Sequence, residues 1–271
     1  MTDALVHPGI PDDPLLIELT PEQFPLHFSE RDGRLFHSQL FSSHYPLPVD
    51  TPEQERLKVM HRVLYLLIGA HYVGPVSDVL APTDEREKLV LDLCTGTGQW
   101  VMDMAREFPH VQFRGIDIVP IATRYPLPNV QFEMHDVNTS YRWRTASVDL
   151  VHARSVSMAI IDYPAILQEI GRVLRPNGLF ISCELDGYPT FQSALRVNPR
   201  ELAPGAYTFF DVLTHALNVC RGIQPIAGTL PALLEAAGCF RDITADLYYL
   251  PIGLWHHDQR MKDIGKKKQT L

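Results

Sequence analysis

The residues best suited to hold a small molecule gather around one glycine-bearing turn. The apolar run Leu89 to Leu93 is followed by the turn Cys94 to Gly98. Gly96 and Gly98 have no Cβ, so the backbone there can approach a bound molecule closely, and Asp92 offers a hydrogen-bond acceptor beside the turn. Glycine turns between a strand and a helix are common, so a purely structural turn is the less favoured alternative for this motif alone.

Two further acids follow the turn at regular spacing. Asp117 stands nineteen residues after Gly98, and Asp136 stands nineteen residues after Asp117. An acid at the end of a second parallel strand can accept hydrogen bonds from both hydroxyls of a ribose, which predicts an adenosine-type ligand. A dinucleotide site would have a small residue three positions beyond Gly98, where this chain has Val101. Asp136, which a dinucleotide site does not need, is expected at the adenine edge.

The elements that must position these acids alternate along the chain. This alternation predicts an α/β fold with right-handed crossovers and a doubly wound, mostly parallel sheet that helices cover on both faces. The expected strands are Leu89 to Leu93, Val111 to Ile118, Val130 to Phe132, Val148 to Ala153, Leu179 to Cys183 and Ile243 to Leu250. The expected helices are Gln99 to Phe108, one that Asp162 opens, Thr208 to Arg221 and Leu230 to Ala237.

We expect one domain with an appended arm. Residues 1–52 hold many prolines, each of which removes a backbone donor, and form the N-terminal arm. An amphipathic helix follows from Glu53 and should end at Gly74-Pro75. Within a single domain over 53–271, the cofactor-binding core is expected at about 88–183 and an α-helical substrate cap at about 184–230.

Composition narrows the classes of function. The 271 residues are 45% hydrophobic, enough for a well-buried core, and 24 Lys and Arg against 32 Asp and Glu give a net charge of −8. This charge argues against nucleic acid or an anionic membrane as partner and favours a small molecule. The four cysteines form no pair at zinc spacing, so we expect no metal site, and a reducing, cytoplasmic compartment fits. The N-terminus does not resemble a signal peptide.

Several motifs resemble those of class I S-adenosylmethionine-dependent methyltransferases: V-L-D-L-C-T-G-T-G-Q-W, G-I-D-I, F-E-M-H-D-V, V-D-L-V-H-A-R and L-R-P-N-G. More narrowly, Y-P-L-P-V-D-T-P-E-Q-E-R-L followed by His61, and later P-I-G-L-W-H-H-D, are similar to the fungal LaeA-like branch of regulators and tailoring enzymes of secondary metabolism. The resemblance covers residues 45–265. It implies a Rossmann-like fold that transfers a methyl group from S-adenosylmethionine to a small-molecule acceptor at oxygen and releases S-adenosylhomocysteine.

Position by position, the resemblance implies Asp92, Gly96 and Gly98 around the methionine part of the cofactor, Asp117 on the ribose, and Asp136 with Val137 at the adenine. Trp100, which opens the helix after the turn, could cover the cofactor or simply pack. The full set of expected cofactor-binding residues is Asp92, Cys94, Gly96, Gly98, Trp100, Asp117, Ile118, Asp136, Val137 and Ala153.

The chain departs from the family in two places. Cys94 stands where many members have their first glycine, which tightens the turn. Members usually continue past P-I-G-x-W into another helix and an antiparallel seventh strand, whereas this sequence stops soon after it, in K-K-K-Q-T-L. We therefore expect that the sheet either is completed by other means or, in a truncated form, lacks the seventh strand.

The candidate catalytic residues are His152, Arg154 and Asp186. His152 comes near the carboxyl end of its strand and could act as a general base, although a hydrogen-bonded strand histidine is an equal alternative. Arg154 could orient an acceptor or pair with a surface acid, and Asp186 follows the fifth strand. His61, on the helix from Glu53, is more often a core residue than a catalytic one.

Two other functions stay open. One is a LaeA-like regulatory module that binds the cofactor, turns over little or no metabolite and works with a protein partner, with the nucleus as its compartment. The other is a nicotinamide oxidoreductase, which Val101 disfavours because it stands where such enzymes need a small residue.

Overall fold

A computed structural model describes residues 16–38, 45–84, 86–191 and 198–268. Residues 1–15 and 39–44 of the expected arm, 192–197 of the expected cap, and positions 85 and 269–271 lie outside the described residues. Within the described ranges, no helix has both the length and the apolar character needed to span a membrane.

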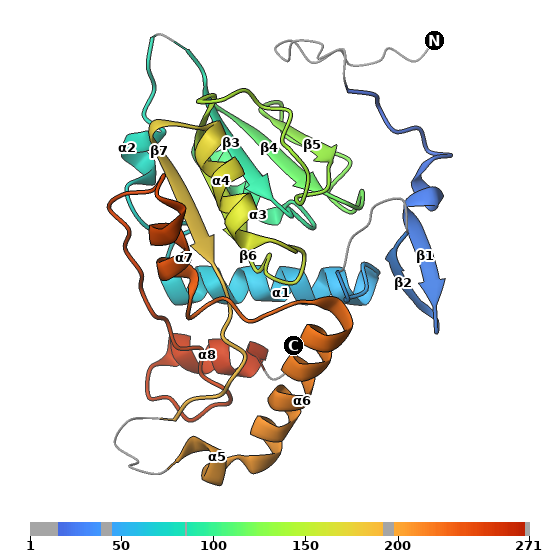
Figure 1. Cartoon of the computed structure of the whole chain (residues 1–271), viewed down its shortest axis with the longest axis vertical. Coiled ribbons are helices and arrows are strands. Elements are labelled where there is room, and N and C mark those ends of the chain that lie inside the picture. The colour runs from blue at the N-terminus through green and yellow to red at the C-terminus, as the bar shows by residue number, and fades with distance from the viewer. Residues whose placement is uncertain (1–15, 39–44, 85, 192–197, 269–271) are drawn as a thin grey trace.

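The centre of the fold is a parallel sheet of five strands in the order β5-β4-β3-β6-β7. The chain adds strands outward from β3 on one side, then returns to the other side of β3 and adds β6 and β7, so the strand order reverses between β3 and β6 (Figure 1). This confirms the doubly wound α/β prediction. The strands are β3 (Lys88–Leu93), β4 (Val111–Asp117), β5 (Val130–Met134), β6 (Val148–Arg154) and β7 (Leu174–Cys183).

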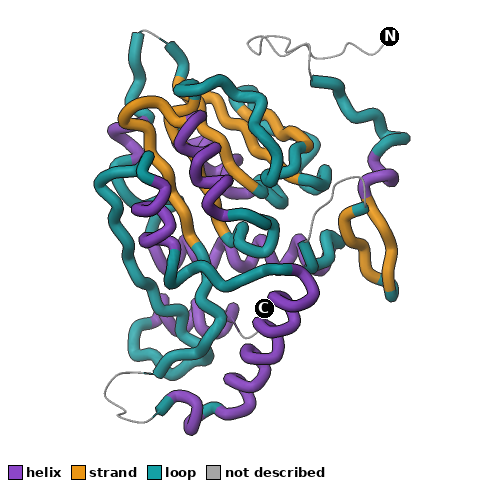
Figure 2. The backbone as a smooth tube through the Cα atoms, in the orientation of Figure 1, coloured by secondary structure: helices purple, strands orange, loops and turns teal. Residues whose placement is uncertain are grey.

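Helices cover both faces of the sheet, as Figure 2 shows. Because successive side chains of a strand point to opposite faces, Val90 packs with Val101 and Met104 of one helix layer, whereas Leu91 packs with Leu167 of the other. The first layer holds α2 (Val76–Val79) and α3 (Gln99–Glu107), and the second holds α4 (Tyr163–Val173) and α7 (Leu230–Ala237).

Helix α1 (Thr51–Ile68) packs against α8 (Gln259–Lys268), whose Ile264 is fully buried. The Asp50 side chain caps α1 by accepting a hydrogen bond from the backbone of Glu53. The helix ends at Gly69, which has a left-handed φ of 84°. The expected end at Gly74-Pro75 is therefore wrong, because Gly69 already provides the left-handed residue that commonly ends a helix.

The described part of the N-terminal arm contains a short 3-10 helix, η1 (Phe24–His27), and a hairpin of β1 (Phe28–Arg31) and β2 (Arg34–His37). The hairpin is tied to the start of α1, because the Arg34 guanidinium donates to both carboxylate oxygens of Asp50. Figure 1 shows it beside the first turn of α1. This ion pair thus holds the described hairpin beside the start of α1.

The expected cap contains α5 (Pro199–Leu202) and α6 (Pro204–Arg221), which begins four residues before the expected Thr208. Helix α6 extends away from the sheet in Figure 1 and buries none of its residues.

The expected strand over residues 243–250 is wrong: this segment is described and has no strand conformation. Its apolar and β-branched residues suggested a strand, but Leu247, Tyr248 and Tyr249 are exposed and only Leu250 joins the α1 and α8 cluster. The parallel sheet formed by the described residues therefore has β7 at its edge, and the antiparallel strand that usually completes the sheet in the resembled family is not present among them.

Candidate functional site

One pocket lies at the carboxyl ends of β3, β4, β5 and β6, and α1 contributes Leu57, Met60 and His61 to its wall. This edge of the sheet is where the strand order reverses, which is the usual place for a ligand in an open α/β sheet. The lining includes ten of the residues predicted from sequence: Asp92, Cys94, Gly96, Trp100, Asp117, Ile118, Asp136, Val137, His152 and Arg154.

The turn after β3 has left-handed backbone at three positions. The φ angles are 53° at Cys94, 55° at Gly96 and 73° at Gly98. A left-handed conformation is costly for a side chain with a Cβ, so Cys94 holds a conformation that a glycine would adopt without strain. Burial raises the pKa of the Cys94 thiol, which keeps it neutral. The turn therefore offers backbone groups to the pocket and no reactive thiolate.

Asp117 ends β4 and holds the turn in place. Its carboxylate accepts hydrogen bonds from the backbone N–H of Gly96 at 2.8 Å and of Val119 at 3.2 Å. Burial raises the pKa of Asp117 to about 6, although these backbone donors oppose the shift. Each carboxylate oxygen can accept more than one hydrogen bond, so Asp117 can still receive hydroxyl groups from a ligand.

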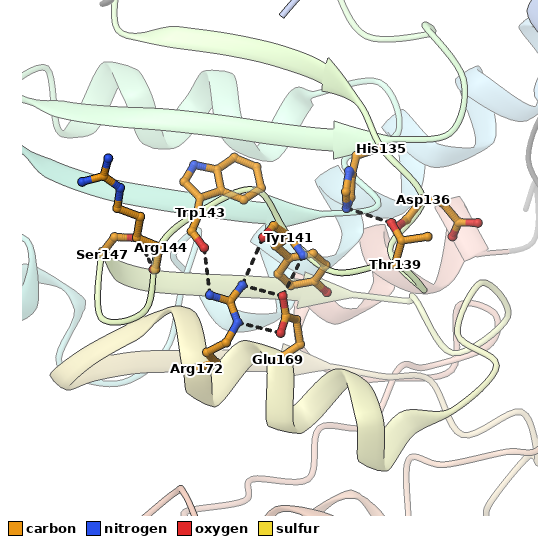
Figure 3. A network of polar contacts seen from close by, with 9 residues as sticks. All are labelled: His135, Asp136, Thr139, Tyr141, Trp143, Arg144, Ser147, Glu169 and Arg172. Atoms are coloured by element: carbon orange, nitrogen blue, oxygen red, sulfur yellow. Dashed lines mark hydrogen bonds and ion pairs between the residues drawn. The ribbon is translucent and has the colours of Figure 1, made fainter. Parts of the chain in front are cut away.

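Asp136 follows β5 and is fixed by its own loop. One carboxylate oxygen accepts both the backbone N–H and the side-chain amide of Asn138, each at 2.9 Å. Figure 3 shows the network that holds this loop, in which Arg172 of α4 donates to the carbonyls of Tyr141 and Trp143. The second oxygen of Asp136 has no partner among the described residues and is available to a ligand.

Asp92 and His152 form a buried pair on adjacent strands. Asp92 Oδ1 lies 2.6 Å from His152 Nδ1, and Asp92 Oδ2 accepts a hydrogen bond from the Thr95 hydroxyl at 2.7 Å. The His152 ring stacks on Trp100, with centroids 3.6 Å apart and planes 8° apart. Burial lowers the pKa of His152, so its ring is neutral near pH 7. Because Nδ1–H donates to Asp92, Nε2 carries the lone pair and can accept a proton.

Arg154, His61 and Asp103 form a second hydrogen-bonded network. Arg154 Nη2 lies 3.0 Å from His61 Nδ1, and His61 Nε2 lies 2.9 Å from Asp103 Oδ2. Burial, and then the Arg154 charge, lower the pKa of His61 to about 4, so the ring is neutral. A guanidinium only donates, so His61 Nδ1 must accept and Nε2–H must donate to Asp103. Gln99 and Arg106 also donate to Asp103.

The same region has a constellation that resembles a metal site. Ligand atoms of His61, His71 and Asp103 lie within 4.8 Å of one another. A metal on Nε2 of a neutral His61 would require the ring proton on Nδ1, where it would face the Arg154 donor. The observed hydrogen bonds therefore favour the hydrogen-bonded network of Arg154, His61 and Asp103 over metal binding.

Three predicted residues lie outside the pocket lining. A Cβ on Gly98 would meet the Phe132 ring at 2.4 Å, so this glycine makes room for packing. Ala153 is 1% exposed and belongs to the core cluster on the α4 face. Asp186 is exposed, and its carboxylate accepts the backbone N–H of Tyr188. The structure therefore does not bring the carboxylate of Asp186 to the pocket.

The pocket also contains residues that the sequence did not single out, among them Tyr45, Leu57, Met60, Gln99 and His135. Burial and nearby acids raise the pKa of Tyr45, which keeps its hydroxyl neutral. Tyr45 begins the Y-P-L-P motif of the resemblance, and this motif was the signal that could have found it.

Comparisons with known proteins show which sequences this chain is similar to. A family profile described as "Methyltransferase domain" matches residues 84–224. The secondary metabolism regulator laeA of Coprinopsis cinerea is 36% identical over 230 residues, which cover 82% of this chain and 56% of that protein. The methyltransferase pytC of Aspergillus terreus is 30% identical over 247 residues, covering 88% of this chain and 70% of that protein.

A third relative is the protein-methionine methyltransferase laeA of Emericella nidulans. It is 28% identical over 249 residues, which cover 88% of this chain and 61% of that protein. The chain thus spans little more than half the length of the Coprinopsis relative and about three fifths of the Emericella relative.

Proposed function

The chain belongs to the methyltransferase-domain family and to its LaeA-like branch, and on this premise we propose that it binds S-adenosylmethionine in the pocket and transfers the methyl group to a small-molecule acceptor. The acceptor atom in this proposal is an oxygen, and the setting is fungal secondary metabolism in the cytoplasm. The name of pytC supports methyl transfer, and the apolar side chains that share the pocket with the acids support a small, partly apolar acceptor.

The observation that carries the proposal is the presence of Asp117 and Asp136 in one pocket beside the Gly96 turn. The residues fit an adenosine ligand. The Asp117 carboxylate has acceptor capacity left for ribose hydroxyls, and the free oxygen of Asp136 suits the amino edge of an adenine. Ile118 and Val137 provide apolar walls for the base.

His152 is the proposed general base. The bound sulfonium supplies an activated methyl group, so positioning is the main requirement and is worth about 7–11 kcal/mol in well-oriented reactions. His152 Nε2 would accept the proton that the acceptor hydroxyl loses when its oxygen takes the methyl group, while the sulfur–methyl bond would break and S-adenosylhomocysteine would leave. Asp92 holds the ring in the competent tautomer and stabilises the imidazolium that forms. Trp100 restrains the ring by stacking on it.

A second candidate is a regulatory protein that methylates a protein, or that binds the cofactor without turnover. The printed names of two relatives, a regulator and a protein-methionine methyltransferase, favour it. In that case the pocket would bind the same cofactor, and the acceptor would be a side chain of a partner protein.

Methyl-labelled S-adenosylmethionine separates the two candidates. The chain is incubated with a fungal metabolite extract and, separately, with fungal proteins, and label is counted in each fraction. We expect label in the metabolite fraction. His152→Asn should lower the rate about 100- to 10,000-fold and leave S-adenosylhomocysteine affinity nearly unchanged. Label confined to protein would favour the second candidate, and an undiminished rate in His152→Asn would remove the histidine from the mechanism.

A further inference from the structure

Arg154 brings a positive charge to the pocket wall that no described carboxylate contacts directly. It ends β6, and its hydrogen-bond partner among the described residues is His61 Nδ1, a neutral acceptor. A guanidinium has five N–H donors, so most of them are left for a ligand. Arg154 is half-buried, and a charge withdrawn from water without an ionic partner is destabilising, so a bound anion would stabilise it.

The two acids that act electrostatically on Arg154 are already engaged. Asp92 gives its oxygens to His152 and Thr95, and Asp103 accepts from His61 as well as from Arg106. Neither turns a carboxylate oxygen to the guanidinium within hydrogen-bonding distance. We therefore expect that the anion that pairs with the Arg154 guanidinium belongs to a bound molecule.

The strand order indicates which end of a nucleoside ligand lies beside the Arg154 guanidinium. Asp136 follows β5 and Asp117 ends β4, while Asp92 lies on β3 and Arg154 ends β6. A ligand with its adenine at β5 and its ribose at β4 extends its remaining part over β3 and β6. There a carboxylate and a guanidinium face one pocket, which complements the ammonium and carboxylate groups of an α-amino acid.

We propose that Arg154 binds the carboxylate of the methionine moiety of S-adenosylmethionine, and that His61 and Asp103 position its guanidinium for this contact. The inference rests on the proposed function and deepens it. Guanidinium and carboxylate groups can form two parallel hydrogen bonds. His61 holds one N–H through Nδ1, and Asp103 fixes the tautomer that makes this acceptor available.

The test compares two ligands that differ in this carboxylate alone: S-adenosylmethionine and decarboxylated S-adenosylmethionine. Calorimetry on the whole chain should find the decarboxylated ligand about 10- to 100-fold weaker. In Arg154→Gln the affinity for S-adenosylmethionine should fall by a similar factor and that for the decarboxylated ligand should barely change, so the discrimination disappears. Arg154→Lys keeps the positive charge but cannot form two parallel hydrogen bonds to a carboxylate, so it should recover part of the discrimination between the two ligands.

Arg106→Gln is the matched control, because Arg106 contacts Asp103 from the exposed side and does not line the pocket. It should keep the wild-type discrimination. His61→Leu should reduce the discrimination by a smaller factor than Arg154→Gln. Thermal unfolding of each variant checks that it is folded.

Two results would overturn the inference and leave the proposed function intact. Equal losses for both ligands in Arg154→Gln would mean that the arginine only supports the pocket wall. Wild-type discrimination in that variant would assign the carboxylate to another residue. If the wild-type chain bound neither ligand, the proposed function itself would fail, and the inference would fail with it.

Discussion

The acids of the pocket differ in what their oxygens already bind. Asp92 gives one oxygen to His152 and the other to Thr95, whereas one oxygen of Asp136 is free among the described residues. Asp117 accepts hydrogen bonds from two backbone N–H groups, and burial raises its pKa to about 6. Similar side chains at neighbouring strand ends are thus suited to different tasks, because their local partners differ.

Binding of S-adenosylhomocysteine should depend on pH through Asp117. The ionised carboxylate accepts ribose hydroxyls with both oxygens, and protonation removes part of that capacity. Because its pKa is about 6, affinity should fall as pH drops below about 6, by up to about tenfold per pH unit. Calorimetry between pH 5 and pH 8 measures this, and Asp117→Asn should bind weakly with no such pH dependence.

The same shift has a consequence for stability with a definite sign. The carboxyl ordinarily titrates at 3.8, and in the folded chain at about 6. The folded state therefore holds this proton more tightly, and its contribution to the free energy of unfolding is lost as pH rises through about 6. The prediction for binding would be contradicted if the wild type and Asp117→Asn showed the same pH profile for S-adenosylhomocysteine affinity, because another group would then cause the pH dependence.

Among the elements, α8 depends on a close approach between two glycines. The Gly253 N–H donates to the Gly265 carbonyl at 3.3 Å, and a Cβ on Gly265 would lie 1.9 Å from the Gly253 oxygen. This contact lets Ile264 reach the cluster that α8 shares with α1. Since α1 also supplies part of the pocket wall, the packing of α8 bears on the site.

Gly265→Ala should therefore lower the free energy of unfolding, by about 1–3 kcal/mol, since it forces apart closely packed backbone. Denaturant unfolding measures the change. Gly205→Ala is the matched control, because a Cβ at this position in α6 meets nothing within 4 Å; it should be neutral or stabilise by up to about 1 kcal/mol. Equal stability of the two variants would contradict the packing described for α8.

The elements also mark the limit of prediction from sequence. The strands at the pocket were predicted nearly to the residue, because apolar runs bounded by turn residues report burial on both faces. Residues 243–250 have a similar composition but no strand beside them, and a sequence pattern cannot supply a pairing partner. Arg154 and His61 are 93 residues apart in the chain, and their contact depends on how α1 lies across the sheet.

At the scale of the whole molecule, the pocket joins segments that lie between Tyr45 and Ala159 in the sequence. Tyr45 comes from the arm, Met60 from α1, Asp117 from β4 and His152 from β6. The half of the pocket formed by the turn after β3 and by Asp117 and Asp136 was predictable, because it depends on a turn and on acids at fixed spacing. The half facing α1 was not, since it depends on packing between distant segments.

Calorimetric titration of the whole chain with S-adenosylhomocysteine, and separately with NAD, tests whether this pocket binds an adenosyl amino acid through Asp117. We expect S-adenosylhomocysteine to bind and Asp117→Ala to weaken its binding about 10- to 100-fold. Asp246→Ala, at an exposed acid outside the pocket, should leave the affinity unchanged. Tight binding of NAD with no response to S-adenosylhomocysteine would mean that the pocket is not a site for an adenosyl amino acid.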